Sequence, residues 1–443
     1  MTEKFFSSRM KKAHATHSRR VWHIAWPLML ANVSAPLLGL VDIGLMGHQG
    51  DSRFLAAVTL GANLFAVVAW GFNFLTMAAS GSTAWLMGRG GRAFATQWLR
   101  RLLPPVAILG VLLLLASPWL IPLGLAFYQP ESELAESAHL YLSIRAWSIP
   151  LVLVNLLLAG WFIGIQKTRV NLWATLCAQA VNILLSVLLV LGFELGITGV
   201  AIGSVVGDAA AFLIYGGTAL RLTMHNLPTV IHRDIPKLTH YLQLAGPLIL
   251  RTFTLLFAFN YFSRLGLNLG TDYVAANAVL LSFLLVISTL LDGFANAAEA
   301  LVGRASGASQ RAQIQGAILI TGLWSAALAV VLCLTFALLH ESTIAWLTDL
   351  PTIRALAGEY VIWMITMPLY TWWAYWLDGV FIGLQWVRAM RNVLLFSVFG
   401  VYWPMSLALP MDTNHSIWAL FALMMLMRSL LMMGWLGLRW RHL

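Results

Sequence analysis

Apolar residues run along this chain in stretches of about 20 or more, separated by short segments rich in Gly, Pro and charged residues. A helix needs about 20 apolar residues to cross about 30 Å of hydrocarbon. The pattern predicts twelve transmembrane helices and no soluble domain, so the expected fold class is an all-α integral membrane protein. The predicted spans are residues 22–47, 56–80, 101–127, 138–162, 170–192, 198–220, 241–266, 274–300, 314–338, 355–382, 391–410 and 416–438.

Composition supports a membrane protein and excludes several other classes. Of 443 residues, 60% are hydrophobic and 10% charged, whereas a soluble domain carries about 25% charged residues. The two cysteines, Cys177 and Cys333, lie in separate apolar stretches and form neither a disulfide framework nor a metal-binding pattern. The chain has no phosphate-binding loop and no hydrolase, protease or redox motif. We therefore expect neither an enzyme nor ATP-driven transport by this chain alone.

The basic residues predict an orientation. In the predicted topology, 21 of the 27 Lys and Arg residues lie in the termini and in the alternate loops of one side, and only Arg53 and Arg354 lie in loops of the other. The positive-inside rule then predicts that both termini are cytoplasmic. The net charge of +10 is read as this orientation signal, so we expect no nucleic-acid partner. The first apolar stretch is too long for a signal peptide and is expected to remain as a span.

A repeat divides the chain into two similar halves. The segment GWFIGIQKTRVNLW at 160–173 is similar to GVFIGLQWVRAMRN at 379–392, 219 positions later. Six spans fall in each copy, so both copies cross the membrane in the same direction and are expected to be related by a pseudo-two-fold axis along the membrane normal. Transporters with such repeats bind their substrates between the halves and alternate access by rocking.

Three segments give the chain a resemblance to a known family. They are WPLMLANVSAPLLGLVDIGLMGH at 26–48, AANAVLLSFLLVISTLLDGFANAAEALVGRASGA at 275–308 and LDGVFIGLQWVRAMRN at 377–392. With them the chain resembles the multidrug and toxic compound extrusion (MATE) family, and most closely its DinF-type branch. The resemblance implies a twelve-helix, two-lobe exporter of cationic or amphipathic compounds that is coupled to proton or sodium entry.

These observations predict a domain organisation. We expect a basic cytoplasmic tail at 1–21, an N-lobe of helices 1–6 at 22–220, a cytoplasmic linker at 221–240 and a C-lobe of helices 7–12 at 241–443. The expected location is the inner membrane of a bacterium, where the protein acts as a monomer. Its partners would be the lipid bilayer and small amphipathic or cationic substrates, with H⁺ or Na⁺ as the coupling ion and no other cofactor.

Ionisable residues in hydrocarbon are costly and mark candidate functional sites. Counting 1.5 Å per residue, four polar residues fall in the outer half of the first repeat and so converge: Asp42, Asn182, Ser204 and Asp208. A buried carboxyl with polar neighbours can act as a proton or cation switch. Arg145 is expected to face the outer cavity or an acidic partner.

The resemblance adds roles to these positions. Asp42 and Asn182 match a first-helix aspartate and a fifth-helix asparagine of the family, and Ser204 stands where a threonine is commoner. Pro36 would weaken the first helix and so act as its hinge. Ser186 replaces a second acid of some archaeal relatives, which removes one potential Na⁺ ligand near Asp42 and favours protons. We therefore expect no firm metal site.

The second repeat has its own polar cluster. Asp292, Asn296 and Glu299 share one helix face through their i, i+4, i+7 spacing, and Arg251 and Asp378 lie in neighbouring predicted spans. Two interpretations stay open: a second proton or substrate site, or a buried ion-pair network that holds the lobe together.

Aromatic and methionine residues supply candidates for substrate contact. Many of the 20 tryptophans lie near span ends, as an interfacial belt predicts. A deeper group lies inside the predicted span 355–382, where cation–π contacts are one interpretation and packing the other. The substrate-cavity candidates are Tyr370, Trp373, Trp376 and Met424.

Together these features predict a proton-coupled antiporter with Asp42 as its protonation switch. The alternatives are a sodium-coupled exporter of the same fold and a flippase for lipids or lipid-linked precursors. A flippase cavity usually carries several arginines, and only Arg145, Arg251, Arg264 and Arg428 lie inside the predicted spans away from their first residues.

Overall fold

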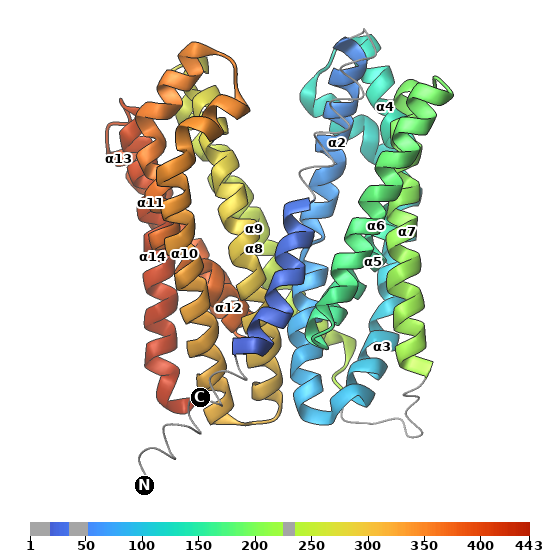
Figure 1. Ribbon diagram of the computed structural model, residues 1–443, viewed down its shortest axis with the longest axis vertical. Coiled ribbons are helices and arrows are strands. Elements are labelled where there is room, and N and C mark those ends of the chain that lie inside the picture. Colours follow the sequence, from blue (N-terminus) through green and yellow to red (C-terminus); the bar gives the residue numbers. More distant parts are fainter. Residues whose placement is uncertain (1–17, 35–51, 225–234) are drawn as a thin grey trace. The chain divides into compact units, whose positions relative to one another are not determined.

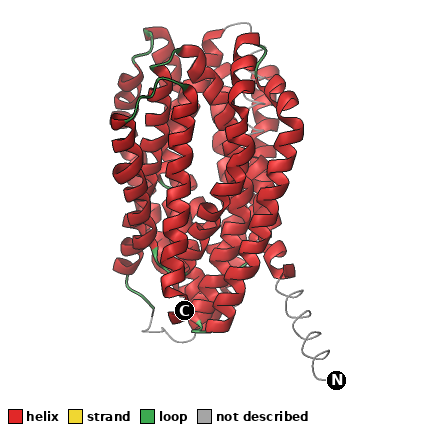
Figure 2. Cartoon of the chain, turned by 90° about the vertical axis from the view of Figure 1, so that its left-hand side faces the viewer, coloured by secondary structure: helices red, strands yellow, loops and turns green. Residues whose placement is uncertain are grey.

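The computed structural model describes residues 18–34, 52–224 and 235–443, and within them it contains helices and no strand (Figure 2). A helix at 18–34 comes first. It is followed by the helices labelled in Figure 1: α2 (Ser52–Gly71), α3 (Phe74–Tyr128), α4 (Ser132–Ala146), α5 (Ile149–Gly164), α6 (Thr168–Val187), α7 (Gly196–Met224), α8 (Leu238–Leu267), α9 (Thr271–Gly307), α10 (Arg311–Leu347), α11 (Pro351–Gly383), α12 (Val387–Leu395), α13 (Trp403–Ala408) and α14 (Asn414–Arg439). Asp42 and Pro36 lie outside the described residues.

Wider helical turns and one terminal turn complete the list. π-helical segments follow α6 at Leu188–Gly192 and α12 at Phe396–Tyr402, and a short 3₁₀ turn, Trp440–His442, follows α14. The two π-helical segments are wider than an α-helix by about one residue per turn, and π-helical segments are frequent at functional sites.

Most helices are longer than the apolar stretches from which they were predicted. Within the described residues, seven helical segments are long and apolar enough to cross a bilayer, and an eighth results if α4 and α5, which meet at a 53° bend, are taken as one span. One of the seven, Ala56–Tyr128, holds two predicted spans. The helix α3 continues through the region between them and breaks only at Gly90 and Gly91. Gly91 has φ 66° and ψ −155°, a conformation that only glycine adopts readily.

The chain divides into two compact units, one of residues 30–242 and one of residues 1–29 with 243–443. In the first, α3 packs mainly on α5 and α6 on α7, and in the second α9 packs on α10 and α11. The early part of the first helix belongs to the second unit, where Trp22 lies 5.3 Å from Phe294 and 5.1 Å from Trp324 between ring centroids. The predicted lobe boundaries stay a prediction.

The two units repeat the same helix contacts. A side chain at Gly164 would approach the carbonyl oxygen of Ser80 to 2.8 Å, and one at Gly383 would approach that of Glu299 to 2.9 Å. Both members of the second pair lie 219 positions after those of the first. Each glycine therefore lets a span pack closely on the second helix of its own repeat, as small residues do in membrane bundles. The same offset relates Gln166 (φ 62°) to Gln385 (φ 60°), each left-handed after its helix.

The second unit also contains an aromatic core and, beside it, a group of buried side-chain hydrogen bonds. Phe262 and Trp418 lie 4.6 Å apart between ring centroids, and both are fully buried. Asn277 on α9 and Asn414 on α14 donate hydrogen bonds to each other's side-chain oxygens at 2.8 and 2.9 Å. The Trp418 indole N–H donates a third bond to Asn277. These buried amides tie α14 to α9 and were not singled out from the sequence.

Candidate functional site

A row of glycines brings α6 and α7 together. Gly199, Gly203 and Gly207 are spaced four residues apart on α7 and share one helix face. A side chain at Gly203 would collide with the hydroxyl of Ser186, and one at Gly207 would approach the carbonyl oxygen of Ala178 to 2.7 Å. The small-xxx-small spacing therefore fixes which side chains of α6 meet α7.

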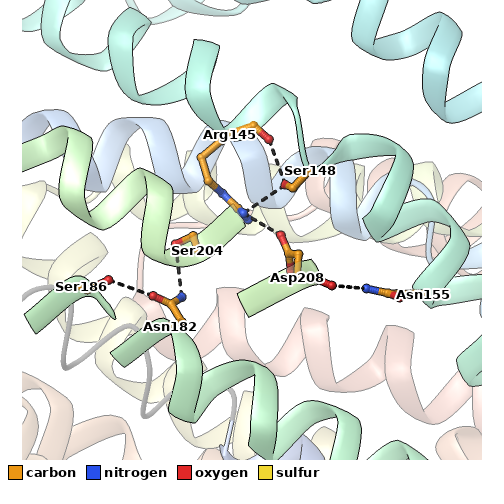
Figure 3. A network of polar contacts seen from close by, with 7 residues as sticks. All are labelled: Arg145, Ser148, Asn155, Asn182, Ser186, Ser204 and Asp208. Atoms are coloured by element: carbon orange, nitrogen blue, oxygen red, sulfur yellow. Dashed lines mark hydrogen bonds and ion pairs between the residues drawn. The ribbon is translucent and has the colours of Figure 1, made fainter. Parts of the chain in front are cut away.

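At this contact three predicted site residues bind one another (Figure 3). The Asn182 side-chain amide donates a hydrogen bond to Ser204 Oγ at 3.2 Å, and Ser186 Oγ donates one to Asn182 Oδ1 at 3.0 Å. All three side chains are buried. The structure thus brings together Asn182 and Ser186 of α6 and Ser204 of α7. The sequence predicted that Asn182 and Ser204 would come together.

One helical turn beyond Ser204, Asp208 forms an ion pair with Arg145 of α4. Arg145 Nη1 lies 2.6 Å from Asp208 Oδ2, and the two side chains are 11% and 27% exposed. The guanidinium also lies 3.9 Å from the centroid of the Phe65 ring on α2. Of the two environments expected for Arg145, the structure shows the acidic partner.

The bend between α4 and α5 holds Arg145 in place. Ser148 Oγ accepts a hydrogen bond from Arg145 Nη1 at 3.1 Å and donates one to the Arg145 carbonyl at 2.9 Å (Figure 3). Two turns later, Asn155 of α5 donates a bond to the backbone carbonyl of Asp208 at 3.0 Å. The serine hydroxyl supplies a partner for a carbonyl that the bend removes from the helical pattern.

The seven residues of Figure 3 therefore form one strip of polar groups across α4, α5, α6 and α7, all within the unit of residues 30–242. Ser148, Asn155 and the ring of Phe65 were not predicted to take part. A serine two residues before a proline, in SIP at 148–150, is the local signal for a bend that would have pointed to Ser148.

The second polar cluster lies in the other unit, where Asp378 of α11 is bound by two arginines. Asp378 Oδ2 accepts a hydrogen bond from Arg428 of α14 at 2.5 Å and another from Arg251 of α8. The Arg428 and Asp378 side chains are 3% and 9% exposed. The Nε atoms of both arginines and Asp378 Oδ1 are buried without a partner among the described residues.

The other members of the predicted second-lobe cluster lie along α9. Asp292 is within electrostatic range of Arg251, Asp378 and Arg428. Asn296 is half-buried, while Glu299 is buried where Gly383 passes its backbone. Of the predicted cluster, Arg251, Asp292 and Asp378 lie near one another, together with Arg428, which was not predicted to belong to it. Glu299 lies seven residues after Asp292 on α9.

The substrate-cavity candidates occupy different surroundings. Trp376 is 5% exposed and donates its indole N–H to Thr321 Oγ1 at 3.0 Å, so it packs between α11 and α10. Met424 is buried in the hydrophobic core of its unit. Trp373 is half-buried against Trp372, with ring centroids 4.5 Å apart, and Tyr370 packs partly buried on the same core.

A metal centre of protein side chains is absent from the described part of the chain, where no three His, Cys, Asp or Glu residues come together. The oxygen atoms of the polar strip are amide, hydroxyl and carboxylate groups, which suit protons and hard cations rather than transition metals.

Comparison with known proteins agrees with this architecture. A model of the MatE family matches residues 27–188 and 247–407, two matches that begin 220 residues apart and confirm the predicted repeat. The chain is 32% identical over 432 residues, 96% of its length and 93% of the relative's, to DNA damage-inducible protein F of Escherichia coli (strain K12). It is 24% identical over 407 residues, 88% and 85% of the two lengths, to the probable multidrug resistance protein NorM of Rhizobium meliloti (strain 1021).

A solved structure has the same fold. It is described as the outward-facing conformation of a multidrug resistance MATE family transporter of the MOP superfamily, and it aligns with a TM-score of 0.82 and 15% identity over 96% of each chain. The all-α membrane fold with its twelve-helix architecture is thereby confirmed. On the family match, the similarity to the Escherichia coli protein along nearly the whole length of both chains, and the fold, this chain belongs to the MatE family of membrane transporters.

Proposed function

We propose that this transporter is a proton-coupled antiporter that exports amphipathic or cationic compounds by alternating access. Protonation of Asp42 would be the switch and Pro36 the hinge of the first helix. The observation that carries the proposal is the strip of buried polar groups in the unit of residues 30–242, within helices of membrane-spanning length. Intramembrane polar groups of this kind mark ion pathways.

The relatives support the direction of transport and the substrate class. The Rhizobium meliloti protein is named a probable multidrug resistance protein, and export is the way a transporter confers resistance. Among the aromatic side chains of α11, the half-buried Tyr370 and Trp373 keep faces that suit flat cations. Trp376 and Met424 are buried in packing contacts and are the weaker candidates.

The proposal includes a location. The protein would lie in the inner membrane of a bacterium as a monomer, with both termini in the cytoplasm. The excess of basic residues in alternate loops supports that orientation. A membrane-impermeant thiol reagent tests this orientation in cells. It should react with a single cysteine at the start of α11 but not with one placed between the predicted spans 56–80 and 101–127.

The coupling ion is tested in proteoliposomes. We expect efflux of a fluorescent cation when a proton gradient is imposed in the absence of sodium, and loss of at least tenfold in Asp42→Asn. Asp412→Asn, which changes an acid in the predicted loop between helices 11 and 12, is the matched control. Efflux that needs sodium and ignores the proton gradient would reverse the ion assignment, and unchanged efflux by Asp42→Asn would remove the switch.

A flippase remains the rival function. Its substrates are anionic lipids, for which a cavity needs several unpaired arginines. Three of the four intramembrane arginines, Arg145, Arg251 and Arg428, are instead bound to aspartates of their own unit. These pairs favour export of cationic or neutral compounds.

A further inference from the structure

The polar strip of α6 and α7 contains the kinds of oxygen atom that bind sodium. Asn182 Oδ1, the hydroxyls of Ser186 and Ser204, and the carboxylate of Asp208 follow one another along the two helices (Figure 3). Hard cations take several oxygen ligands, and at least one of these is normally a carboxylate in an all-protein site. The strip therefore contains the types of oxygen ligand that a sodium site needs.

Arg145 changes the charge of that strip. Its guanidinium contacts the Asp208 carboxylate directly, so the pair contributes no net negative charge. Asp208 lies one helical turn from Ser204, a separation of about 5–6 Å between Cβ atoms. A cation bound among the serine and amide oxygens would therefore lie close to a fixed positive charge, and at such distances the repulsion remains large inside a membrane protein.

Two of the remaining oxygen atoms already accept a hydrogen bond. Asn182 Oδ1 accepts the Ser186 hydroxyl proton, and Ser204 Oγ accepts the Asn182 amide. A proton, by contrast, binds a single carboxyl through an O–H bond and needs no coordination shell. The arrangement thus removes from this strip the free carboxylate that a sodium site requires.

The position of Arg145 is set by groups from two other helices and from the bend that follows α4. The Phe65 ring lies against its guanidinium from α2, Ser148 binds it at the bend, and Asp208 binds it from α7. An arginine that served only to neutralise a buried acid would need the last of these contacts alone. The additional contacts hold the charge next to the strip.

We propose that Arg145 is the residue that makes this site reject sodium, as a fixed internal cation that occupies the carboxylate of Asp208. Arg145 is in this sense a specificity-determining residue. The proposal rests on the proposed function, in that the strip of α6 and α7 is taken as part of the cation pathway. Its consequence is that removal of one positive charge creates a sodium site.

The test measures sodium binding to purified full-length protein in lipid nanodiscs. Arg145→Met removes the charge and keeps an apolar stem over Phe65. We expect it to bind ²²Na⁺ at least tenfold more tightly than the unchanged protein, and to unfold roughly 1–3 °C higher in NaCl than in choline chloride of the same concentration. The unchanged protein should show no such difference.

Two further variants separate charge from structure. Arg145→Lys keeps a cation and should bind no sodium. The double variant Arg145→Met with Asp208→Asn lacks both charges and should lose the gain, because the carboxylate ligand is absent. If Arg145→Met does not give folded protein, Arg145→Gln, which retains a hydrogen-bond donor for Ser148, replaces it.

The proposal is overturned if folded Arg145→Met and Arg145→Gln bind sodium no more tightly than the unchanged protein, or if Arg145→Lys gains sodium equally. Sodium binding that persists in the double variant would equally refute the role of Asp208. These measurements need no transport. Failure of the proton-driven efflux assay would therefore refute the proposed function while leaving the sodium result to stand or fall separately.

Discussion

The sixth helix of each repeat carries one intramembrane charge, and the two charges have opposite sign. Asp208 on α7 and Arg428 on α14 are 220 positions apart, the spacing at which the family model matches twice. Each forms an ion pair with a residue from the fourth predicted span of its own repeat. Asp208 pairs with Arg145 on α4, and Arg428 pairs with Asp378 on α11. The pairing of these helices is thus maintained while its polarity is reversed.

The two pairs differ in burial and in stoichiometry. The Asp208 side chain is 27% exposed and has one arginine, whereas the Asp378 side chain is 9% exposed and has two. Water reaches the partly exposed Arg145–Asp208 pair and screens its charges, whereas the buried cluster of three charges loses much stability if one partner is removed. The comparison supports a functional role for the first pair and a structural one for the second.

The largest expected effect is on the closed cluster. Asp378→Asn leaves Arg251 and Arg428 buried without their shared counter-charge, and breaking such a buried pair costs about 3–5 kcal/mol. We expect low yield and a strongly lowered unfolding temperature in detergent. Asp292→Asn, which removes a nearby acid that bonds neither arginine, is the matched control and should be milder. Equal stability of Asp378→Asn and the unchanged protein would remove the structural interpretation.

The corresponding change in the other unit should cost less. Asp208→Asn leaves Arg145 with Ser148 and Phe65 as partners, and its partial exposure lets water screen the charge. We expect a loss of about 1–2 kcal/mol in the free energy of unfolding, measured under the same conditions as for Asp378→Asn. If Asp208→Asn proves the more damaging of the two, the assignment of roles to the two pairs is reversed.

A third prediction concerns the contact that assembles the polar strip. Gly203→Ala places a methyl group against Ser186 and should separate α6 from α7 by a few tenths of an ångström, at a cost of about 1–2 kcal/mol. Gly216→Ala on the same helix meets no neighbouring atom and should be neutral or slightly stabilising. Thermal unfolding of the two variants side by side measures the difference.

The smallest effect is expected at Trp376. Trp376→Phe keeps an aromatic ring between α11 and α10 but loses the bond to Thr321, which is worth about 0.5–1.5 kcal/mol. Thr321→Val should cost a similar amount, and the double variant should cost little more than either. Full additivity in this double-mutant cycle would show that the two side chains do not interact.

Much of the fold could be predicted because hydropathy and spacing are local properties of a chain. The described residues of the predicted spans are mostly helical, with breaks at 72–73 and 147–148, and the repeat seen in GWFIGIQ and GVFIGLQ reappears as equivalent close contacts of Gly164 and Gly383. The ends were less accurate, since helices such as α9 and α10 continue past their apolar stretches. The unbroken helix before Gly90 was missed for the same reason.

The candidate site was predictable only in part. Depth along each helix placed Asn182 and Ser204 in the outer half of the first repeat, and the structure joins them. Depth alone could not decide the partner of Asp208, since helix rotation and the bend at Ser148 determine which side chains face one another. For the same reason the spacing that put Glu299 in one cluster with Arg251 and Asp378 could not show that Arg251 binds Asp378.

The sequence by itself determined that this protein is a duplicated helical membrane transporter and which few ionisable side chains lie in hydrocarbon. Only the tertiary structure decided how those charges are matched, because the partners are far apart along the chain. Arg145 and Asp208 are separated by 63 positions, and Arg251 and Asp378 by 127. Hydropathy reports the cost of burying each charge, while packing geometry alone decides which opposite charge offsets it.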